Sequence, residues 1–261
     1  MHALGLVSIS FRSLTPRQII AAVKEAGLTC IEWGSDVHAP CNDVEKLMDI
    51  ATAMQEAGVT CCSYGTYFTL GKDPIEQLLP YIHAAKILGT NILRLWCGNK
   101  GSRDYTCEER DALYEECRAA AKIAETYGIT LCMECHNWYI NDRKEAALAL
   151  VEAVNSPAFR LYWQPNQFST VEENLAYIKL LAPYITHVHV FNWCGKDWVG
   201  KEDFPPPGTM PDMYPLAEGI DTWKQYLQNL PNNTLLLEFM PDNRVESLPV
   251  EAAALKKIVG E

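Results

Sequence analysis

The chain has 261 residues, close to the length of one eight-stranded α/β barrel, although two smaller domains would also fit. Hydrophobic residues make up 48% and charged residues 21%, as is usual for a soluble globular protein. The 22 Lys and Arg stand against 33 Asp and Glu, giving a net charge of −11. This balance argues against a nucleic-acid partner, which normally requires a basic surface.

The apolar runs are the length of strands and fall well short of the ~20 residues that span a membrane. Residues 1–5 lack the basic start and hydrophobic core of a signal peptide. The ten cysteines are scattered through apolar runs, which favours buried, reduced thiols. We therefore expect a cytoplasmic protein with no membrane partner.

Eight short runs rich in β-branched and aromatic residues predict eight strands. In chain order they cover residues 4–11, 29–33, 59–64, 91–96, 129–135, 160–164, 185–191 and 235–240. Apolar residues between them recur with helical spacing, and most strands are about 25 to 40 residues apart. This alternation predicts βαβ units and a parallel sheet.

Helix boundaries support this interpretation. Five segments combine an N-cap residue with an acid or amide three positions later, and they begin at Thr15, Asn42, Asp73, Thr106 and Thr170. Four glycines end helical patterns just before a strand: Gly27, Gly58, Gly89 and Gly128. The expected fold is α/β, a single (β/α)8 TIM barrel over residues 1–261. An open doubly wound sheet is the alternative, but residues 8–12 are not a glycine-rich phosphate loop.

One long irregular stretch, residues 193–219, follows the seventh predicted strand. In a barrel it would lie on the face where active sites form, and loops of this length are usually functional. Its aromatic residues Trp193, Trp198 and Phe204 fit a lid or an oligomer contact, and the sequence leaves both open.

Polar residues stand near the ends of five predicted strands, where an apolar core would not place them. They are Glu32, Glu134 with His136, Gln164, His187 with His189, and Glu238. An ionised glutamate in such a strand costs several kcal/mol unless it is paired or bound to a metal. Converging carboxylates and an imidazole favour a divalent cation, namely Mn²⁺, Mg²⁺ or Co²⁺, with Zn²⁺ as a further candidate.

With these strand-end residues, the chain resembles the xylose isomerase-like barrel superfamily over essentially its whole length. That group includes ketose 3-epimerases, inosose dehydratases and, more distantly, endonuclease IV. The resemblance implies one metal ligand from each of strands five to eight, namely Glu134, Gln164, His189 and Glu238. It places His187 beside the ligands, and the Glu134-Cys135-His136 segment matches a branch with an inward histidine just after the ligand glutamate.

The chain departs from the epimerase pattern at four positions. Gln164 replaces an aspartate ligand and Gln167 replaces a histidine. Ile140 and Gly195 stand where the epimerases have substrate-contacting Glu and Arg residues. A glutamine oxygen can bind a hard cation but brings no charge, so we expect weaker metal binding.

Further substrate contacts are predicted around the strand ends, and the candidates are Glu32, His38, Arg94, Trp96, His136, His187 and Lys196. Arg94 and Trp96 alternate inward on the fourth strand, and an aromatic wall beside a cation suits a sugar ring. An ion pair between Arg94 and Glu32 is an equally good interpretation. His38 lies on the loop after strand two, and Lys196 lies on the loop after strand seven. For Lys196 the alternative is simple solvation, which is the more common role of a lone lysine.

The predicted function is an isomerase or epimerase that acts on a small keto-sugar or sugar derivative. A divalent metal would stabilise the enediolate while Glu134 and Glu238 exchange the proton next to the carbonyl. The first alternative is a lyase or dehydratase on a keto-sugar or 3-keto-glycoside, through the same enolate chemistry.

A metal-free sugar-binding barrel subunit is the non-catalytic alternative, suggested by Gln164 and Gln167. An endonuclease is disfavoured, because six histidines and an acidic surface do not suit a trinuclear zinc site on DNA. The expected partner is a small carbohydrate, and a homo-oligomer is left open.

Overall fold

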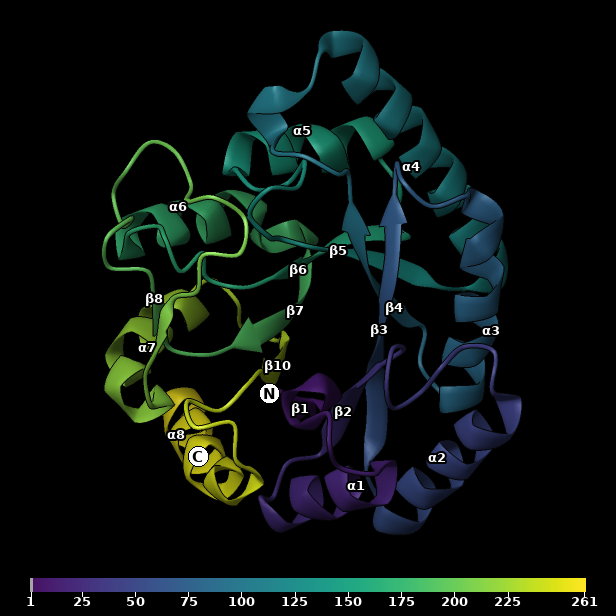
Figure 1. The fold of residues 1–261 in the computed structure, drawn as a ribbon, viewed down its shortest axis with the longest axis vertical. Coiled ribbons are helices and arrows are strands. Elements are labelled where there is room, and N and C mark those ends of the chain that lie inside the picture. The colour runs from purple at the N-terminus through teal and green to yellow at the C-terminus, as the bar shows by residue number, and fades with distance from the viewer. Residues whose placement is uncertain (1) are drawn as a thin grey trace.

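The computed structural model describes residues 2–261, and eight of its strands pair in parallel around a closed barrel (Figure 1). The last of them returns to the first, with Leu4 opposite Leu235 and Gly5 opposite Leu236. The eight are β1 (Leu4–Val7), β2 (Cys30–Gly34), β3 (Thr60–Leu70), β4 (Ile92–Cys97), β5 (Thr130–Glu134), β6 (Phe159–Trp163), β7 (Ile185–Val190) and β10 (Thr234–Leu237). The predicted (β/α)8 barrel is confirmed.

Eight α-helices cover the outside of the barrel (Figure 1). They are α1 (Pro16–Glu25), α2 (Val44–Ala57), α3 (Leu78–Leu88), α4 (Cys107–Tyr127), α5 (Lys144–Val154), α6 (Val171–Leu181), α7 (Ile220–Leu227) and α8 (Leu248–Val259). Six short 3₁₀ helices join them, namely Ser8–Phe11, Ile75–Gln77, Ser102–Asp104, Ala182–Tyr184, Leu216–Gly219 and Val245–Ser247. No helix within residues 2–261 is long and apolar enough to cross a membrane.

Local sequence explains most helix boundaries. Three helices, α1, α4 and α6, begin with complete capping boxes at Thr15, Thr106 and Thr170. The four glycines predicted at helix ends, Gly27, Gly58, Gly89 and Gly128, all have positive φ. Their left-handed backbone turns the chain from each helix back toward the next strand.

Two predicted caps differ in the structure. At α2 the cap is Asp43 rather than Asn42, because the Asp43 carboxylate accepts a hydrogen bond from the backbone N–H of Lys46. After Asp73 the chain forms a 3₁₀ turn at Ile75–Gln77, and α3 begins only at Leu78, without a side-chain cap.

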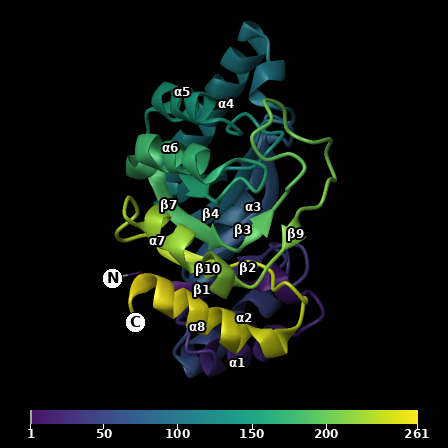
Figure 2. The same ribbon diagram turned by 90° about the vertical axis from the view of Figure 1, so that its left-hand side faces the viewer.

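Two strands and one loop also differ from expectation. The first predicted strand ends at Val7, and residues 8–11 form a 3₁₀ turn. β3 continues to Leu70, six residues beyond its predicted end at residue 64. The irregular segment 193–219 contains a small antiparallel pair, β8 (Trp193–Cys194) with β9 (Asp212–Met213), and projects beyond the barrel before α7 (Figure 2).

The core has two parts. The larger lies between strands and helices, and the smaller fills the barrel interior with Val7, Ile9, Cys30, Cys132, Tyr162 and Leu236. Polar residues replace this apolar filling toward the carboxyl ends of the strands, which is the end where barrel enzymes carry their active sites.

Candidate functional site

Four polar residues converge at the carboxyl ends of β5, β6, β7 and β10. Atoms of Glu134, His189 and Glu238 that could bind a metal lie within 4.8 Å of one another. His189 Nδ1 is 3.0 Å from Gln164 Oε1, 3.4 Å from Glu238 Oε2 and 3.9 Å from Glu134 Oε1. We call Glu134, Gln164, His189 and Glu238 the central cluster. The structure thus brings together the four residues that the resemblance implied as ligands.

A buried ion pair holds Glu134 from one side. Arg94 on β4 lies between two carboxylates, and its Nε donates a hydrogen bond of 2.8 Å to Glu32 Oε1 while its Nη1 donates to Glu134 Oε2. Trp96 Nε1 donates to the same Glu134 oxygen at 2.6 Å. One Glu134 oxygen is therefore engaged by two donors, whereas the other faces His189.

Glu238 has a different environment. Within residues 2–261 its carboxylate accepts no side-chain hydrogen bond from an arginine or tryptophan, and its near polar neighbour is His189. The residue is nevertheless buried, at 7% exposure. The two cluster carboxylates are thus unequal: Glu134 is clamped and Glu238 is not.

The cluster and its ion pair carry an excess of negative charge. Three buried carboxylates, Glu32, Glu134 and Glu238, face one guanidinium, Arg94, so the formal charge is −2 with neutral histidine. His189 Nε2 has no hydrogen-bond partner, although Glu32 Oε1 lies 3.6 Å away. Oxygen and imidazole donors around an uncompensated charge of −2 fit a hard divalent cation.

The pKa directions reflect this excess. Burial raises the pKa of Glu238 above its usual range, and the Glu134 carboxylate adds to the effect. Burial would also raise the pKa of Glu134, but the charge of Arg94 outweighs it and holds that pKa low. Burial would lower the pKa of His189, but Glu238 and Glu32 raise it instead. Protons at Glu238 and His189 would thus offset negative charge that a cation would otherwise balance.

Two other predicted residues lie beside the cluster. His187 stacks on Tyr162 at a ring distance of 5.1 Å, and burial lowers its pKa to about 4. His136 follows β5, and its ring lies 5.9 Å from that of Tyr139. Trp96 also packs on Tyr139, at 5.3 Å, so these aromatic rings form one wall next to Glu134.

The structure does not bring His38 or Lys196 to the cluster. His38 is buried, with its two ring nitrogens 3.2 Å from Ser8 Oγ and 3.2 Å from the Leu14 carbonyl. Lys196 is exposed and lies 3.5 Å from Asp212 Oδ2. His38 thus contacts the segment between β1 and α1, and Lys196 contacts β9.

Three further residues, Tyr162, Ser63 and Asn141, support the cluster and were not predicted from the sequence. Tyr162 lies 4.6 Å from the His189 ring, and its hydroxyl is 3.1 Å from Ser63 Oγ, which donates to Glu32. Asn141 donates a 2.9 Å hydrogen bond to the backbone carbonyl of Glu134. Tyr162 is two residues before Gln164, so strand alternation already pointed to it. Asn141 follows an irregular loop and had no comparable signal.

The 193–219 segment is anchored above the cluster by aromatic residues. Trp193 stacks on Phe191 at 3.9 Å and lies 5.9 Å from Phe239, the residue after Glu238. Trp138, four residues after Glu134, donates through Nε1 to the Pro205 carbonyl at 2.9 Å. Both Trp138 and Phe239 have positive φ, at 69° and 54°. These contacts place the segment over the ends of β5 and β10, where a lid would lie.

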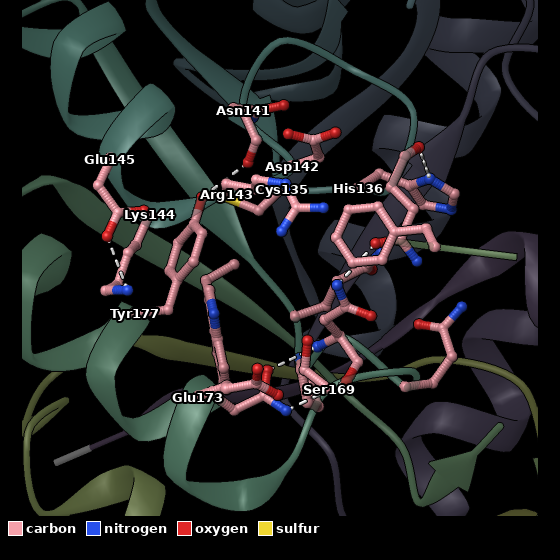
Figure 3. Close-up of a pocket in the computed structure, with 18 of the residues that line it drawn as sticks. Cys135, His136, Asn141, Asp142, Arg143, Lys144, Glu145, Ser169, Glu173 and Tyr177 are labelled. Atoms are coloured by element: carbon pink, nitrogen blue, oxygen red, sulfur yellow. Dashed lines mark hydrogen bonds and ion pairs between the residues drawn. The ribbon is translucent and has the colours of Figure 1, made fainter. Parts of the chain in front are cut away.

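A cavity of about 290 Å³ adjoins the cluster on the side of the β5–α5 and β6–α6 loops (Figure 3). We call it the side cavity. Gln164 and His136 line it, together with Asn137, Arg143, Asn166 and Phe204, whereas Glu134, His189 and Glu238 do not. The converging carboxylates are the better candidate for the reaction centre, and the side cavity is space next to it.

A family model described as "Xylose isomerase-like TIM barrel" matches residues 20–249. A curated relative, the 3-dehydroshikimate dehydratase of Bacillus anthracis, is 22% identical over 178 residues, which are 64% of this chain and 62% of the relative. The match therefore spans less than two thirds of that relative's length.

Two solved structures share the whole fold. The probable 3-DHS dehydratase AsbF from Bacillus anthracis has a TM-score of 0.81 at 20% identity, covering 98% of this chain and 99% of that one. A D-psicose 3-epimerase with D-tagatose, from Clostridium cellulolyticum H10, has a TM-score of 0.68 at 15% identity, covering 98% and 99%. The relatives are enzymes, a dehydratase and an epimerase, in agreement with the predicted enzyme.

Proposed function

The chain belongs to the xylose isomerase-like TIM barrel family, and we propose that it is a divalent-metal-dependent lyase acting on a small hydroxylated ketone. It removes the proton next to the carbonyl and eliminates water across the adjacent carbon–carbon bond. The observation that carries this proposal is the unequal environment of the two cluster carboxylates. A dehydratase among the relatives supports it.

The central cluster would hold the metal through Glu134, Gln164, His189 and Glu238, the residues whose donor atoms converge. When bound, a cation such as Mn²⁺, Mg²⁺ or Co²⁺ supplies Lewis acidity that polarises the carbonyl and stabilises the negative charge of the enolate. A formal charge of −2 around the cluster supports a divalent ion.

Glu238 is the base in this proposal. Its carboxylate has no arginine or tryptophan donor, so the oxygen that does not bind the metal can accept a proton from the carbon next to the carbonyl. The electron pair of that C–H bond forms the new C=C bond, and the C–O bond of the β-hydroxyl breaks. Glu238 then returns the proton to the departing hydroxyl, so that the net loss is one water.

Glu134 has the complementary role. Because Arg94 and Trp96 both donate to Glu134 Oε2, that oxygen is committed, and the side chain is held as a fixed ligand. Epimerisation requires two groups that exchange protons with opposite faces of one carbon. A clamped carboxylate opposite a free one suits one-base elimination better.

An isomerase or epimerase acting on a keto-sugar is the second candidate. It is favoured by the approach of both Glu134 Oε1 and Glu238 Oε2 to His189 Nδ1, which lets two carboxylates reach one substrate. The first step, proton removal next to a carbonyl, is the same. The two candidates differ in where the proton and the hydroxyl go afterwards.

Product analysis separates them. Protein loaded with Mn²⁺ is incubated with 3-dehydroshikimate and, separately, with D-psicose, and the products are followed by NMR in D₂O. We expect loss of water and a new C=C bond from the first substrate. Interconversion of the ketose without elimination would overturn the lyase assignment in favour of the second candidate. Metal removal by a chelator should abolish turnover, and Mn²⁺ should restore it.

A further inference from the structure

The side cavity differs from the central cluster in the number of cationic side chains that line it. Four cationic side chains line it, namely Arg103, Arg143, Lys144 and Lys201, in a chain whose net charge is −11. Three carboxylates also line it, and among the described residues Asp142 Oδ1 is buried without a hydrogen-bond partner. Asp142 accepts from the backbone N–H of Ser102, Glu145 pairs with Lys144, and Glu173 accepts from the backbone N–H of Thr170.

The four cations are not equivalent. Lys144 is paired with Glu145, and Arg103 is paired with Glu202 and Asp203 at the exposed edge. Lys201 is exposed and lies over the Trp198 ring. Arg143 is partly buried and forms no ion pair within residues 2–261. It is therefore the inward cation with unused capacity for an anion.

Neighbouring groups hold the Arg143 guanidinium in the cavity (Figure 3). Its Nη2 donates to the Glu202 carbonyl at 2.8 Å, and its Cζ lies 4.7 Å from the centre of the Phe204 ring. Only one of the five guanidinium N–H groups is used in that hydrogen bond. An arginine fixed in this way offers a ready, directional partner for a carboxylate.

The start of α5 adds a second feature that favours an anion at the same place. Arg143 is the N-cap residue of this 11-residue helix, and it provides no side-chain cap. The first-turn N–H groups and the helix dipole therefore favour negative charge near residues 143–145. These backbone groups and the Arg143 guanidinium belong to one wall of the side cavity.

The side cavity is connected to the reaction centre. Gln164 lines the cavity, and its Oε1 lies 3.0 Å from His189 Nδ1 in the central cluster. We propose that the side cavity binds a carboxylate of the substrate through Arg143, so that the substrate is a small hydroxylated keto acid rather than a neutral sugar. This inference rests on the proposed lyase function and names its substrate class.

Kinetics with a matched pair of substrates test the proposal. Metal-loaded wild type and Arg143→Met are assayed with 3-dehydroshikimate and with its uncharged methyl ester. We expect Arg143→Met to raise KM for the acid about tenfold or more, with a smaller change in kcat and little change for the ester. Arg143→Lys, which keeps the charge but loses the planar fork, should retain part of the preference. Arg17→Met, at an exposed position on α1, is the matched control and should leave KM and kcat unchanged for both substrates.

A binding measurement separates this proposal from the proposed function. The probe is 3,4-dihydroxybenzoate, the acid that forms when 3-dehydroshikimate loses water. Calorimetry measures the affinities of this acid and of its methyl ester for wild type, Arg143→Met and Glu238→Gln. Preference for the acid in wild type and Glu238→Gln, lost in Arg143→Met, supports the carboxylate site even if no elimination is found. Equal effects of Arg143→Met on acid and ester would overturn the site, even if wild type eliminates water as proposed.

Discussion

At the carboxyl end of the barrel, charged residues are buried both near β2–β4 and near β5–β10. The hydrogen bonds that these charged residues make differ between the two sides. On the β2–β4 side, Glu32 is paired with Arg94 and accepts a hydrogen bond from Ser63, so its network is closed. On the β5–β10 side, the oxygens of Gln164 and Glu238 share one histidine nitrogen, His189 Nδ1, at 3.0 Å and 3.4 Å. Buried charge alone therefore does not mark a reaction centre. Several acceptors that converge on one shared nitrogen donor do.

Glu134 joins the two sides. One oxygen belongs to the closed network through Arg94 and Trp96, and the other faces His189. The β2–β4 side thus orients a residue of the β5–β10 side. We call the β5–β10 side the open side and the β2–β4 side the closed side. Changes on the open side should affect activity first, whereas changes on the closed side should affect stability first.

The largest effect is expected from the open side. Glu238→Gln removes the proposed base but keeps shape and polarity, so turnover should fall about 10²–10⁴-fold while the fold persists. Glu134→Gln should also reduce turnover strongly, because it removes a charged ligand held by Arg94. Initial rates at saturating Mn²⁺ and circular dichroism give the two measurements. Full activity in Glu238→Gln would remove it from its proposed role.

The next effect concerns the closed side. Arg94→Met leaves two buried carboxylates, Glu32 and Glu134, without their arginine, so the free energy of unfolding should fall by about 3–5 kcal/mol. The matched control is the double variant Glu32→Gln with Arg94→Met, which removes the Glu32 and Arg94 charges together and should recover the part of the loss that comes from Glu32. Denaturant unfolding of both proteins measures the difference. Equal losses in the two would mean that the pair does not act as a closed unit.

Much of the fold was predictable because its signals are local. Complete capping boxes at Thr15, Thr106 and Thr170 and left-handed glycines such as Gly58 are properties of a few adjacent residues. The early end of β1 was not predictable in this way. Ser8 Oγ accepts from the Gly34 N–H, and Ser10 Oγ accepts from the Phe239 N–H, so contacts with distant strands bend the chain there.

The central cluster was predictable for a related reason. Strand alternation and the family resemblance together placed Glu134, His189 and Glu238 on inward positions of a barrel, where parallel strands end at one face. Alternation did not decide whether Arg94 contacts substrate or Glu32, because that depends on side-chain conformation. The side cavity was not foreseen at all, since Arg143 and Phe204 lie in segments without periodicity.

A smaller effect is expected when a negative charge is added to the open side. Gln164→Asp adds a carboxylate next to His189, so Mn²⁺ affinity should rise by about tenfold if Gln164 is a ligand. Gln164→Glu, which keeps the side-chain length, is the matched control for reach. A metal titration of the three proteins gives the result. Unchanged or weaker affinity in both variants would place Gln164 outside the metal site.

The smallest effect is expected from a histidine on the closed side. His38 follows β2 there, whereas His189 belongs to the open side. His38 is buried between Ser8 Oγ and the Leu14 carbonyl, and burial lowers its pKa below the usual value. The unfolded chain therefore binds a proton that the folded chain does not, once the pH falls below about 6.5. The contribution of His38 to stability is complete above that pH and declines below it, by at most about 1.4 kcal/mol per pH unit. His38→Gln should accordingly flatten the acid side of the stability curve, measured by urea unfolding between about pH 5 and 8, and leave metal affinity unchanged. If the variant and wild type lose stability in parallel over this range, His38 is not held neutral by its surroundings, and the closed side is less closed than its hydrogen bonds indicate.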